Sequence, residues 1–485
     1  MVDSVIGRDV EISVLKEALN TDKGEMIAVV GRRRVGKTYL VEEVYKDRIV
    51  FEQTGIRGAT MAEQLRTFSD KLELAGHQNT RPVESWLDAF FQLRLYLTEI
   101  LREADEKKVV FFDELPWLAV PETKFLNFLG YFWNDFAERE NLVVVLCGSA
   151  SSWLINKVVN DPGGLHNRIT RYLHLKPFTL AETEVFLMAK GIKFSRYETT
   201  RIYMCMGGIP RYLEDVKPGL SADQLIEKIC FTNGGFLQKE FDRLYTSLFK
   251  NAHHHIAVIK ALSASRQGLS RKQLIAASGI PNGGPGSRVL EELVQCDFIA
   301  AQPSFGNKKK GKLYRLIDEF SLFHLRFIDQ AGAGASWARI SESQAYKIWC
   351  GYAFENVCIK HILEIKQAMS IAGIASSTYS LYRKGNSERK GMQIDMLLER
   401  ADKVINLFEI KFYSAKYAIS KAEAERIREK SAHLTESMGR RYSVMIVYIT
   451  PFGVVKNENS LGLVQHSLML DDLFLEKPEV RAGGW

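Results

Sequence analysis

Residues 31–38 read Gly-Arg-Arg-Arg-Val-Gly-Lys-Thr, which is a complete G-x-x-x-x-G-K-[ST] phosphate-binding pattern. An apolar run of strand length, residues 26–30, precedes it, and residues 39–44 continue as a predicted helix. A strand, a glycine-rich loop and a helix in this order are the context in which such a loop holds a phosphate. A chance Gly-Lys-Thr in a turn is therefore the weaker interpretation, and the sequence predicts a nucleoside triphosphate site.

The chemistry of the loop residues predicts their roles. Gly31 and Gly36 allow the backbone to curl so that its N–H groups face a phosphate. Lys37 adds a positive charge toward the terminal phosphates, and the Thr38 hydroxyl can ligate Mg²⁺. The expected cofactors of this site are therefore ATP and Mg²⁺.

Two further strand ends complete the expected site. The apolar residues 109–112 end in Asp113 and Glu114. Asp113 is expected to hold the magnesium, and Glu114 to polarise the attacking water, so the pair predicts hydrolysis as well as binding. A third apolar run, residues 142–146, leads to Ser149, whose hydroxyl could sense the terminal phosphate. Apolar strands alternating with helices indicate an α/β fold with a parallel sheet buried on both faces, and its ligand at the carboxyl ends of the strands.

Length and composition bound the rest of the molecule. With 485 residues the chain is long for one hydrophobic core, so two to four domains are expected. It has 46% apolar and 25% charged residues, as in an ordinary soluble protein, and no apolar run that could span a membrane. The six cysteines show no C-x-x-C spacing, so we expect reduced thiols and a cytoplasmic protein.

Positive charge is concentrated in one segment. The formal net charge is +7, and residues 250–317 contain eleven Lys and Arg residues against three Asp and Glu residues, a net of +8. This segment also has the element order of a winged helix-turn-helix, with helices expected at 256–262, 270–278 and 287–294, and residues 281–286 expected as a turn.

A strand pair brackets a lysine-rich tip in the same segment, as a wing would. Residues 298–300 and 313–317 are the expected strands, and residues 306–311 read Gly-Asn-Lys-Lys-Lys-Gly. Lysines at such a tip would contact phosphates without reading bases, so we expect DNA as a partner. A protein-binding version of the fold with a solvated loop is the alternative. The expected DNA contacts are Arg288, Lys308, Lys309, Lys310 and Lys312.

The C-terminal part predicts a second chemical site. Residues 392–398 and 404–411 are expected to form two strands joined by a hairpin turn. Asp395 lies in the first strand, and alternation places Glu409 and Lys411 on one face of the second.

These residue types suit phosphodiester hydrolysis. Two carboxylates, Asp395 and Glu409, collect Mg²⁺ or Mn²⁺, while Lys411 orients the water or stabilises developing charge. Glu355, one helix earlier, could be a further metal ligand or a supporting base. A solvated hairpin with a salt bridge would look the same locally. Glu409 and Lys411, however, interrupt an otherwise apolar strand, where unpaired charge is costly.

Together these motifs resemble a known family. Over nearly its whole length the chain is similar to the archaeal-type ATPases of the STAND branch of AAA+-like NTPases that carry a C-terminal PD-(D/E)XK nuclease-like domain. The phosphate loop, Asp113-Glu114 and Cys147-Gly148-Ser149 match its ATPase motifs, and Phe354-Glu355, Asp395 and Glu409-Ile410-Lys411 match its nuclease motifs. The chain departs from the nuclease signature at Ile394, where proline would precede the aspartate.

The resemblance implies roles for further residues. Gly7 and Arg8 belong to a lead-in that passes near the adenine, and Pro210 to the Gly-x-Pro of a helical lid. Arg168 is implied as a sensor or arginine finger, with Arg171 as the alternative. The implied domains are an ATPase core (1–178), a helical lid (179–248), a winged helix (249–318), a linker (319–344), a nuclease-like domain of restriction-endonuclease type (345–470) and a tail (471–485).

Two functions follow from this organisation. The first is an ATP-binding and ATP-hydrolysing, DNA-binding protein whose metal-dependent endonuclease is regulated by nucleotide state. The alternative is an ATP-dependent DNA-binding regulator with an inactive nuclease-like scaffold. We expect DNA as a partner and no membrane, and homo-oligomerisation is left open.

Overall fold

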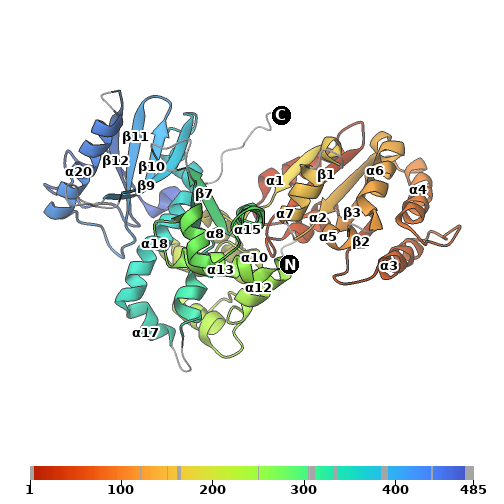
Figure 1. The fold of residues 1–485 in the computed structure, drawn as a ribbon, viewed down its shortest axis with the longest axis horizontal. Coiled ribbons are helices and arrows are strands. Elements are labelled where there is room, and N and C mark those ends of the chain that lie inside the picture. The colour runs from red at the N-terminus through yellow and green to blue at the C-terminus, as the bar shows by residue number, and fades with distance from the viewer. Residues whose placement is uncertain are drawn as a thin grey trace. The chain divides into compact units, whose positions relative to one another are not determined.

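The computed structural model describes residues 5–120, 123–149, 151–160, 165–249, 251–303, 305, 312–331, 336–383, 392–438 and 441–475. The chain divides into two compact units, Met1–Pro177 and Phe178–Trp485 (Figure 1). The first unit ends one residue before the expected end of the ATPase core. None of the helices within the described ranges is both long and apolar enough to cross a membrane.

The first unit is built on a five-stranded parallel sheet in the order β2-β3-β4-β1-β5. Every residue of β1 and β4 is buried, as expected for central strands covered on both faces. The predicted strands at 26–30, 109–112 and 142–146 are confirmed as β1, β3 and β4. The strands are β1 (Glu25–Val30), β2 (Ile49–Thr54), β3 (Lys108–Asp113), β4 (Leu142–Cys147) and β5 (Arg171–His174).

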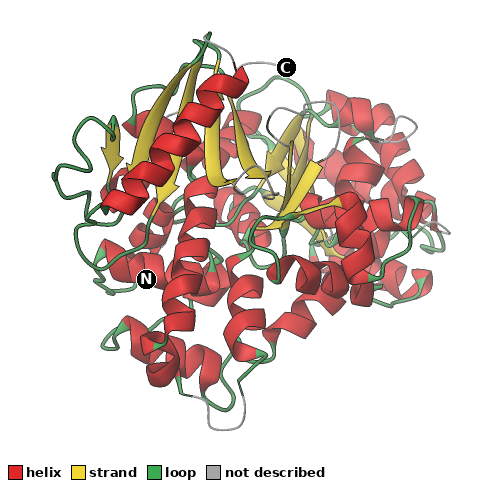
Figure 2. Ribbon diagram, turned by 60° about the vertical axis from the view of Figure 1, so that its left-hand side comes forward, coloured by secondary structure: helices red, strands yellow, loops and turns green. Residues whose placement is uncertain are grey.

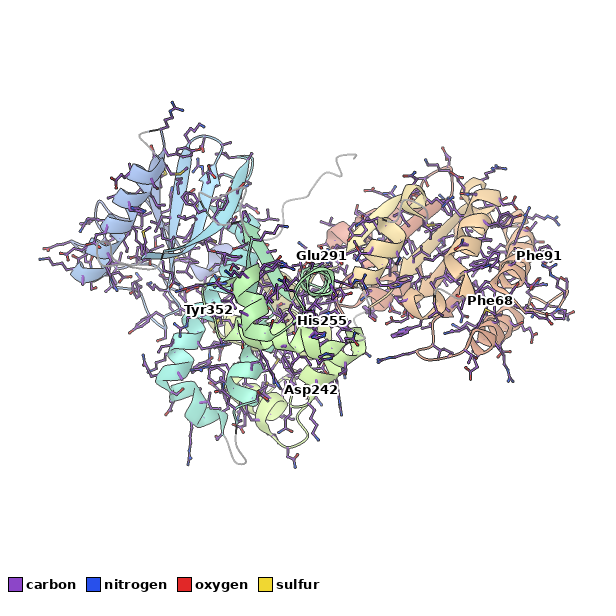
Figure 3. All side chains as sticks on the ribbon, viewed as in Figure 1. Phe68, Phe91, Asp242, His255, Glu291 and Tyr352 are labelled. Atoms are coloured by element: carbon purple, nitrogen blue, oxygen red, sulfur yellow. The ribbon has the colours of Figure 1, made fainter. Side chains whose placement is uncertain are left out.

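Helices cover this sheet, and aromatic side chains fill the space between the helices and the strands. Phe68, labelled in Figure 3, lies in this core and packs edge-on against Trp86, with ring centroids 5.8 Å apart. Phe90 and Phe112 belong to the same cluster. The helices are α1 (Asp9–Leu19), α2 (Lys37–Tyr45), α3 (Met61–Leu74), α4 (Trp86–Arg102), α5 (Leu115–Leu118), α6 (Phe125–Asp135) and α7 (Ser151–Leu154).

The second unit begins with helices and a small sheet. Strands β6, β8 and β7 form a three-stranded antiparallel sheet in this order. The elements are α8 (Leu180–Ala189), α9 (Arg196–Met206), α10 (Pro210–Leu213), α11 (Ala222–Ile226), α12 (Glu240–Leu248), α13 (Ala252–Ser263), β6 (Leu269–Ser270), α14 (Arg271–Ser278), α15 (Gly284–Gln295), β7 (Ile299–Pro303) and β8 (Lys312–Leu316).

The N-termini of α14 and α15 follow different sequence patterns, a capping serine in α14 and a proline in the first turn of α15. Ser270 caps α14 and forms a capping box with Gln273, as its position predicts. The turn expected at 281–286 was too long, because α15 already begins at Gly284 with Pro285 in its first turn. Proline is tolerated there, since its missing N–H would have no partner within the helix.

The C-terminal part of this unit carries a second five-stranded sheet, in the order β13-β12-β11-β10-β9. The expected hairpin is confirmed, because β10 and β11 pair antiparallel, and β12 then joins β11 in parallel. The elements are β9 (Ser376–Arg383), β10 (Met392–Arg400), β11 (Val404–Ile410), β12 (Ser443–Ile449), β13 (His466–Leu468) and the helices α18 (Gln344–Lys360), α19 (Ile362–Ala368) and α20 (Lys421–Met438).

Helix α20 runs across one face of this sheet (Figure 2). Ile427 belongs to one hydrophobic cluster with Ile446 of β12, and Leu434 belongs to another with Ile405 and Leu407 of β11, so apolar residues on two turns of the helix fix it to the strands. The side chains between these anchors are thereby held over the sheet.

Two expected boundaries differ from the structure. The segment 319–344, expected as a linker, contains α16 (Glu319–Phe323) and α17 (Trp337–Glu342). Phe320 and Trp337 are buried, so hydrophobic burial fixes much of this segment, while the small residues at 332–335 lie outside the described part. The expected tail likewise begins with packed residues, because Leu473 and Phe474 are buried.

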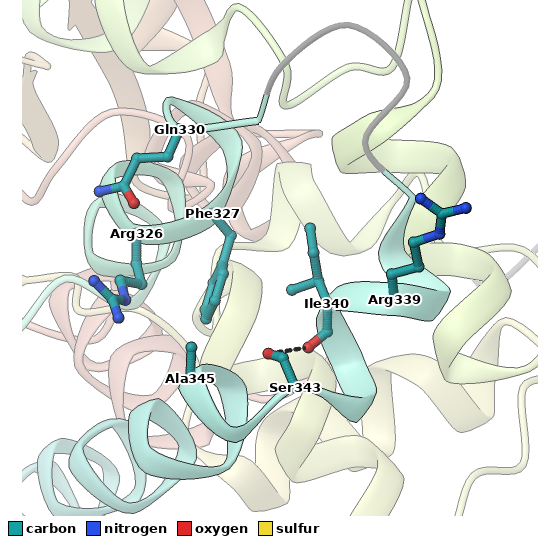
Figure 4. Close-up of a pocket in the computed structure, with 7 residues that line it drawn as sticks. All are labelled: Arg326, Phe327, Gln330, Arg339, Ile340, Ser343 and Ala345. Atoms are coloured by element: carbon teal, nitrogen blue, oxygen red, sulfur yellow. Dashed lines mark hydrogen bonds between the residues drawn. The ribbon is translucent and has the colours of Figure 1, made fainter.

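A shallow hollow of about 280 Å³ lies in the second unit (Figure 4). Phe327 and Ile340 line its middle, while Arg326 and Arg339 lie at its margins. None of the site residues predicted from the sequence lines this hollow.

Candidate active sites

The phosphate loop joins the end of β1 to the start of α2, and two glycines shape it. Gly31 has φ +150°, and a Cβ added there would lie 2.3 Å from the carbonyl oxygen of Leu175. Only glycine therefore fits at this close approach. Gly36 has φ +89° and precedes the first residue of α2, so the turn aims the free N–H groups of the helix start into the loop.

Lys37 and Thr38 bring charge and a magnesium-type ligand to this loop. The buried Lys37 ammonium donates to the carbonyl oxygens of Gly31 and Arg32, at 2.8 and 3.0 Å, and is thereby held over the loop. The Thr38 hydroxyl donates to Asp113 Oδ2 at 2.8 Å. The predicted meeting of the loop with the acidic end of β3 is therefore present in the structure.

Glu114 leaves the strand in a left-handed backbone conformation, with φ +46°. This turn directs its carboxylate toward the end of β4, where Oε2 accepts hydrogen bonds from the Ser149 N–H and hydroxyl, at 3.2 and 2.8 Å. Ser149 reaches Glu114 because β4 lies between β1 and β3. The predicted sensor residue thus contacts the predicted water-polarising carboxylate.

Ser151, which the sequence analysis did not single out, and Cys147 of the sensor-strand motif also lie at this site. The Ser151 hydroxyl accepts a hydrogen bond from the Gly31 N–H at 3.0 Å, and so fixes the first residue of the phosphate loop. Cys147 is fully buried at the end of β4, and burial together with the neighbouring Asp113 raises the pKa of its thiol. The position of Ser151, two residues after Ser149, is the signal that could have identified it.

The described residues of this site suit ATP and magnesium. The Thr38 hydroxyl and the Asp113 carboxylate are hard oxygen donors of the kind that Mg²⁺ prefers, and they lie within hydrogen-bonding distance of each other. Gly31 and Gly36 keep the loop free of side chains where backbone N–H groups would face a phosphate.

The lead-in segment touches the same loop. Gly7 and Arg8 both have positive φ, at 65° and 75°. The Arg8 side chain is buried and donates to the carbonyl oxygen of Val35 in the phosphate loop, at 3.3 Å. The structure therefore brings Arg8 to the nucleotide site from the N-terminal side.

The two arginines implied as sensor or finger have different surroundings. Arg168 Nε donates to the side-chain oxygen of Asn134 on α6, at 2.8 Å. Arg171 lies within ion-pair distance of Glu17 and Glu25, at 3.2 and 3.6 Å. Arg171 thereby helps to anchor β5, which leaves Arg168 as the better candidate.

Pro210 lies in the second unit, at the first position of α10. The preceding Gly208 packs tightly on Phe178, because a Cβ added at Gly208 would lie 2.0 Å from the Phe178 carbonyl oxygen. The Gly208 carbonyl also accepts the Phe178 N–H at 2.6 Å. The Gly-x-Pro segment therefore fixes the first residue of the second unit.

The C-terminal site contains a buried carboxylate between two lysines. Glu409, near the end of β11, accepts from Lys411 at 3.2 Å through Oε2, and its Oε1 contacts Lys430 of α20. Burial opposes ionisation, but the two ammonium groups hold the pKa of Glu409 below its ordinary value. The predicted proximity of Glu409 and Lys411 is therefore confirmed, and Lys430 is an addition that the sequence analysis missed.

Glu423 extends this network. Its carboxylate lies 3.8 Å from the Lys411 ammonium and accepts hydrogen bonds from the hydroxyls of Tyr417 and Tyr448, at 2.8 and 3.3 Å. Burial lowers the pKa of Lys411, but Glu409 and Glu423 outweigh it and raise that pKa. Lys411 is consequently a fixed positive charge at this strand end.

For Asp395 the structure describes only the backbone, whereas for Glu355 it also describes the side chain. The ladder pairs Met396 with Phe408, so the Asp395 backbone on β10 lies beside Glu409, while its side chain lies outside the described part. Glu355 accepts from Arg315 of β8 at 2.9 Å and is held by that ion pair. Among the described side chains, no group of three His, Cys, Asp or Glu residues is arranged to hold a metal.

The donor chemistry at this strand end still fits a divalent metal. Glu409 is a buried, ionised carboxylate, and the strand pairing brings the Asp395 backbone next to it. Carboxylate oxygens of this kind are the ligands that Mg²⁺ and Mn²⁺ take.

The expected DNA contacts are described in part. Arg288 is exposed on α15, and Lys312 is exposed at the start of β8. Lys308, Lys309 and Lys310 lie outside the described residues. Arg271 contacts Asn282, Gly283 and Ser287, so it fixes the turn between α14 and α15.

Comparison with known proteins identifies the first site. Residues 6–216 match the model of a family described as an ATPase domain predominantly from Archaea. The chain is also similar to the uncharacterized protein MJECL04 of Methanocaldococcus jannaschii, with 23% identity over 418 residues that cover 85% of this chain and 88% of that protein.

Two solved structures are similar over two thirds of the chain. The Walker-type ATPase PABY2304 of Pyrococcus abyssi has a TM-score of 0.49 and 17% identity, covering 67% of this chain and 97% of that chain. The ORC2 protein of Aeropyrum pernix has a TM-score of 0.42 and 15% identity, covering 67% and 94%. Residues 6–216 thus match an ATPase domain found predominantly in Archaea, and the phosphate loop and its acidic strand end lie within this matched region.

Proposed function

We propose that this protein binds and hydrolyses ATP, binds DNA, and cuts DNA at a metal-dependent site in its C-terminal part, with cleavage regulated by nucleotide state. The observation that carries the nuclease proposal is the contact of the buried Glu409 carboxylate with the half-buried Lys411 at the end of a sheet strand. A buried carboxylate is costly even when it is paired, and phosphodiester cleavage is a use that accounts for it.

ATP hydrolysis follows from the residues around the phosphate loop. Lys37 neutralises charge on the terminal phosphates, and Thr38 with Asp113 would hold Mg²⁺, which supplies charge stabilisation when bound. Glu114 orients and polarises the attacking water, and Ser149 positions the Glu114 carboxylate.

Arg168 is the proposed sensor or arginine finger of this reaction. An arginine finger supplied by a neighbouring copy would make the active ATPase a homo-oligomer. Pro210 and the helices after Phe178 are the proposed lid, in keeping with the STAND-type organisation that the motifs resemble.

DNA binding is assigned to the segment from α13 to β8. Its helices, strands and antiparallel sheet follow one another as in a winged helix-turn-helix, which supports this assignment. In that fold α15 is the recognition helix, and its exposed Arg288 is available to a DNA backbone. The net positive charge of this segment favours a polyanion over an acidic protein surface.

The nuclease site is assigned to the ends of β10 and β11. Asp395 and Glu409 are the proposed ligands of Mg²⁺ or Mn²⁺, which when bound polarises the phosphate and lowers the pKa of a bound water. Lys411 then stabilises the charge that develops on the phosphate. The mixed sheet, with α20 across one face, supports a PD-(D/E)XK-like fold.

The second candidate is an ATP-dependent DNA-binding regulator whose nuclease-like domain is a scaffold. The observation that favours it is the ion pair that ties Glu355 to Arg315. Plasmid cleavage separates the two candidates. Metal-dependent nicking that is lost in Lys411→Ala supports the nuclease, whereas DNA binding without cleavage in Mg²⁺ and Mn²⁺ supports the regulator.

A further inference from the structure

We propose that Lys430 is a built-in competitor for the divalent metal at Glu409, so that the nuclease site binds metal weakly until a phosphodiester draws the Lys430 ammonium away. This inference rests on the proposed function of the same site. It adds a positioning residue, supplied by α20, to the carboxylates and the lysine of the strands.

The first support is that ammonium groups hold both oxygens of the Glu409 carboxylate. Lys411 donates to Oε2 and Lys430 contacts Oε1. The Glu409 side chain is only 5% exposed, so a cation that approaches it must share or replace these contacts. A metal ion bound through Oε1 would take the place of the Lys430 ammonium.

The second support is that the two lysines are held unequally. Lys411 lies between Glu409 and Glu423, and Tyr417 and Tyr448 fix the Glu423 carboxylate by hydrogen bonds. The described contact of Lys430 is with Glu409. Displacing Lys430 therefore leaves the remainder of the network in place, whereas displacing Lys411 would leave the buried Glu423 with less compensation.

The third support is the position of Lys430 on its helix. Ile427 and Leu434, three residues before and four after it, are buried against the sheet and hold this stretch of α20 in place. The Lys430 side chain is 21% exposed, and its four-carbon stem is flexible. The ammonium can consequently move from Glu409 to a phosphate without movement of the helix.

The charges around Glu409 indicate how removal of the Lys430 charge should change the affinity for a divalent metal. Lys411 and Lys430 balance Glu409 and Glu423, so these four groups sum to zero. Removal of the Lys430 charge leaves a net negative charge, which attracts a divalent cation more strongly. An incoming phosphodiester offers Lys430 an alternative anionic partner.

The test is Mn²⁺ binding to the full-length chain without nucleotide, measured by calorimetry and by the loss of the free-ion electron paramagnetic resonance signal. All variants carry Asp113→Asn, which removes the carboxylate ligand of the ATPase site. Lys430→Met should lower the Mn²⁺ dissociation constant about tenfold, because it removes a positive charge that repels the ion from Glu409. Lys430→Gln provides a second uncharged variant, and thermal melting checks the fold of each protein.

Two controls make this measurement specific. Lys421→Met removes an exposed charge from the same helix and should leave Mn²⁺ affinity within about twofold, because exposed charges are screened by solvent and salt. Lys430→Arg keeps the charge and should keep the weak affinity. Glu409→Gln should abolish the tight binding seen in Lys430→Met.

The outcomes also separate this inference from the nuclease proposal. Tighter Mn²⁺ binding in the Lys430 variants with no DNA cleavage by any protein would uphold the competitor role and overturn the nuclease. Unchanged or weaker Mn²⁺ binding in folded Lys430→Met and Lys430→Gln would overturn the competitor role even if DNA is cut. Tight binding that survives Glu409→Gln would overturn it as well, because the ion would then lie elsewhere.

Discussion

The Glu114 carboxylate accepts two hydrogen bonds from Ser149, one from the backbone N–H at 3.2 Å and one from the hydroxyl at 2.8 Å. Glu114 follows β3 and Ser149 follows β4, so the contact joins the ends of neighbouring strands. Glu114 also has a left-handed backbone conformation, which aims its side chain at this point. Ser149 thus sets the orientation of the residue that we assign to water activation.

This contact predicts the effect of Ser149→Ala. Loss of the hydroxyl leaves the N–H bond but loosens Glu114, so the turnover number for ATP should fall about tenfold, a loss typical of a misplaced catalytic group. The nucleotide dissociation constant should not change. Steady-state phosphate release and fluorescent-nucleotide binding measure the two quantities. Wild-type turnover in Ser149→Ala would remove Ser149 from this role, and Ser149→Thr is the conservative control.

Lys37 and Glu114 should separate binding from hydrolysis. Lys37→Ala removes the positive charge beside the terminal phosphates, so nucleotide binding should be abolished. Glu114→Gln keeps the size of the side chain but not its basicity, so it should retain ATP and stall hydrolysis by at least about a hundredfold. Equilibrium ATP binding and single-turnover ATP hydrolysis are measured for both variants and for wild type. Equal turnover in Glu114→Gln and wild type would exclude Glu114 as the water-activating base.

A buried histidine predicts a pH dependence of stability. His324 stacks on Phe241, with ring centroids 4.6 Å apart, and burial lowers its pKa from 6.5 to about 4. The unfolded chain therefore takes up a proton near pH 6.5 that the folded chain accepts only near pH 4. The stabilising contribution is complete above pH 6.5 and is lost as the pH falls toward 4, by up to about 3 kcal/mol.

Urea unfolding of wild type and His324→Phe between pH 7.5 and pH 4.5 checks this prediction. The difference in unfolding free energy between the two proteins should change in favour of His324→Phe as the pH is lowered. A difference that is constant with pH would mean that His324 takes up its proton equally in the folded and unfolded chains.

The lysines of the proposed wing predict how DNA binding should depend on salt. Replacement of Lys308, Lys309 and Lys310 by Ala should weaken binding to all sequences and reduce the slope of log affinity against log salt by about 2 to 3. Fluorescence anisotropy over a salt series measures both effects. The matched control replaces Lys16, Lys23 and Lys46, three exposed lysines of the ATPase unit, by Ala. An equal loss in both triple variants would show a general charge effect without a DNA-binding wing.

Most elements that carry the sites could be predicted from the sequence, because their patterns are local. The phosphate loop has a fixed spacing, and β1, β3 and β4 are apolar runs of strand length. Strands β2 and β5 were missed for a physical reason. Residues 49–54 read Ile-Val-Phe-Glu-Gln-Thr, with three polar residues after three apolar ones, and residues 171–174 include Arg and His, so both segments lack the continuous apolar run of a central strand. They lie at the two edges of the sheet, where such residues are tolerated.

The site residues Lys430 and Glu423 were not predicted from the sequence for a different reason. Lys430 and Glu423 reach Glu409 and Lys411 only because α20 folds back over the sheet. The ion pair of Glu355 with Arg315 likewise joins residues 40 positions apart. Single-sequence patterns give the spacing along one element, whereas contacts between elements depend on the tertiary packing that apolar residues such as Ile427 determine.

The most direct test of the central proposal is cleavage of supercoiled plasmid and linear DNA, in Mg²⁺ or Mn²⁺, with and without ATP. Wild type, Lys411→Ala and Glu114→Gln are compared. We predict metal-dependent cleavage by wild type, its loss in Lys411→Ala, and a changed response to ATP in Glu114→Gln. DNA binding without cleavage under every condition, or equal cleavage by Lys411→Ala, would contradict the proposed nuclease and favour the DNA-binding regulator.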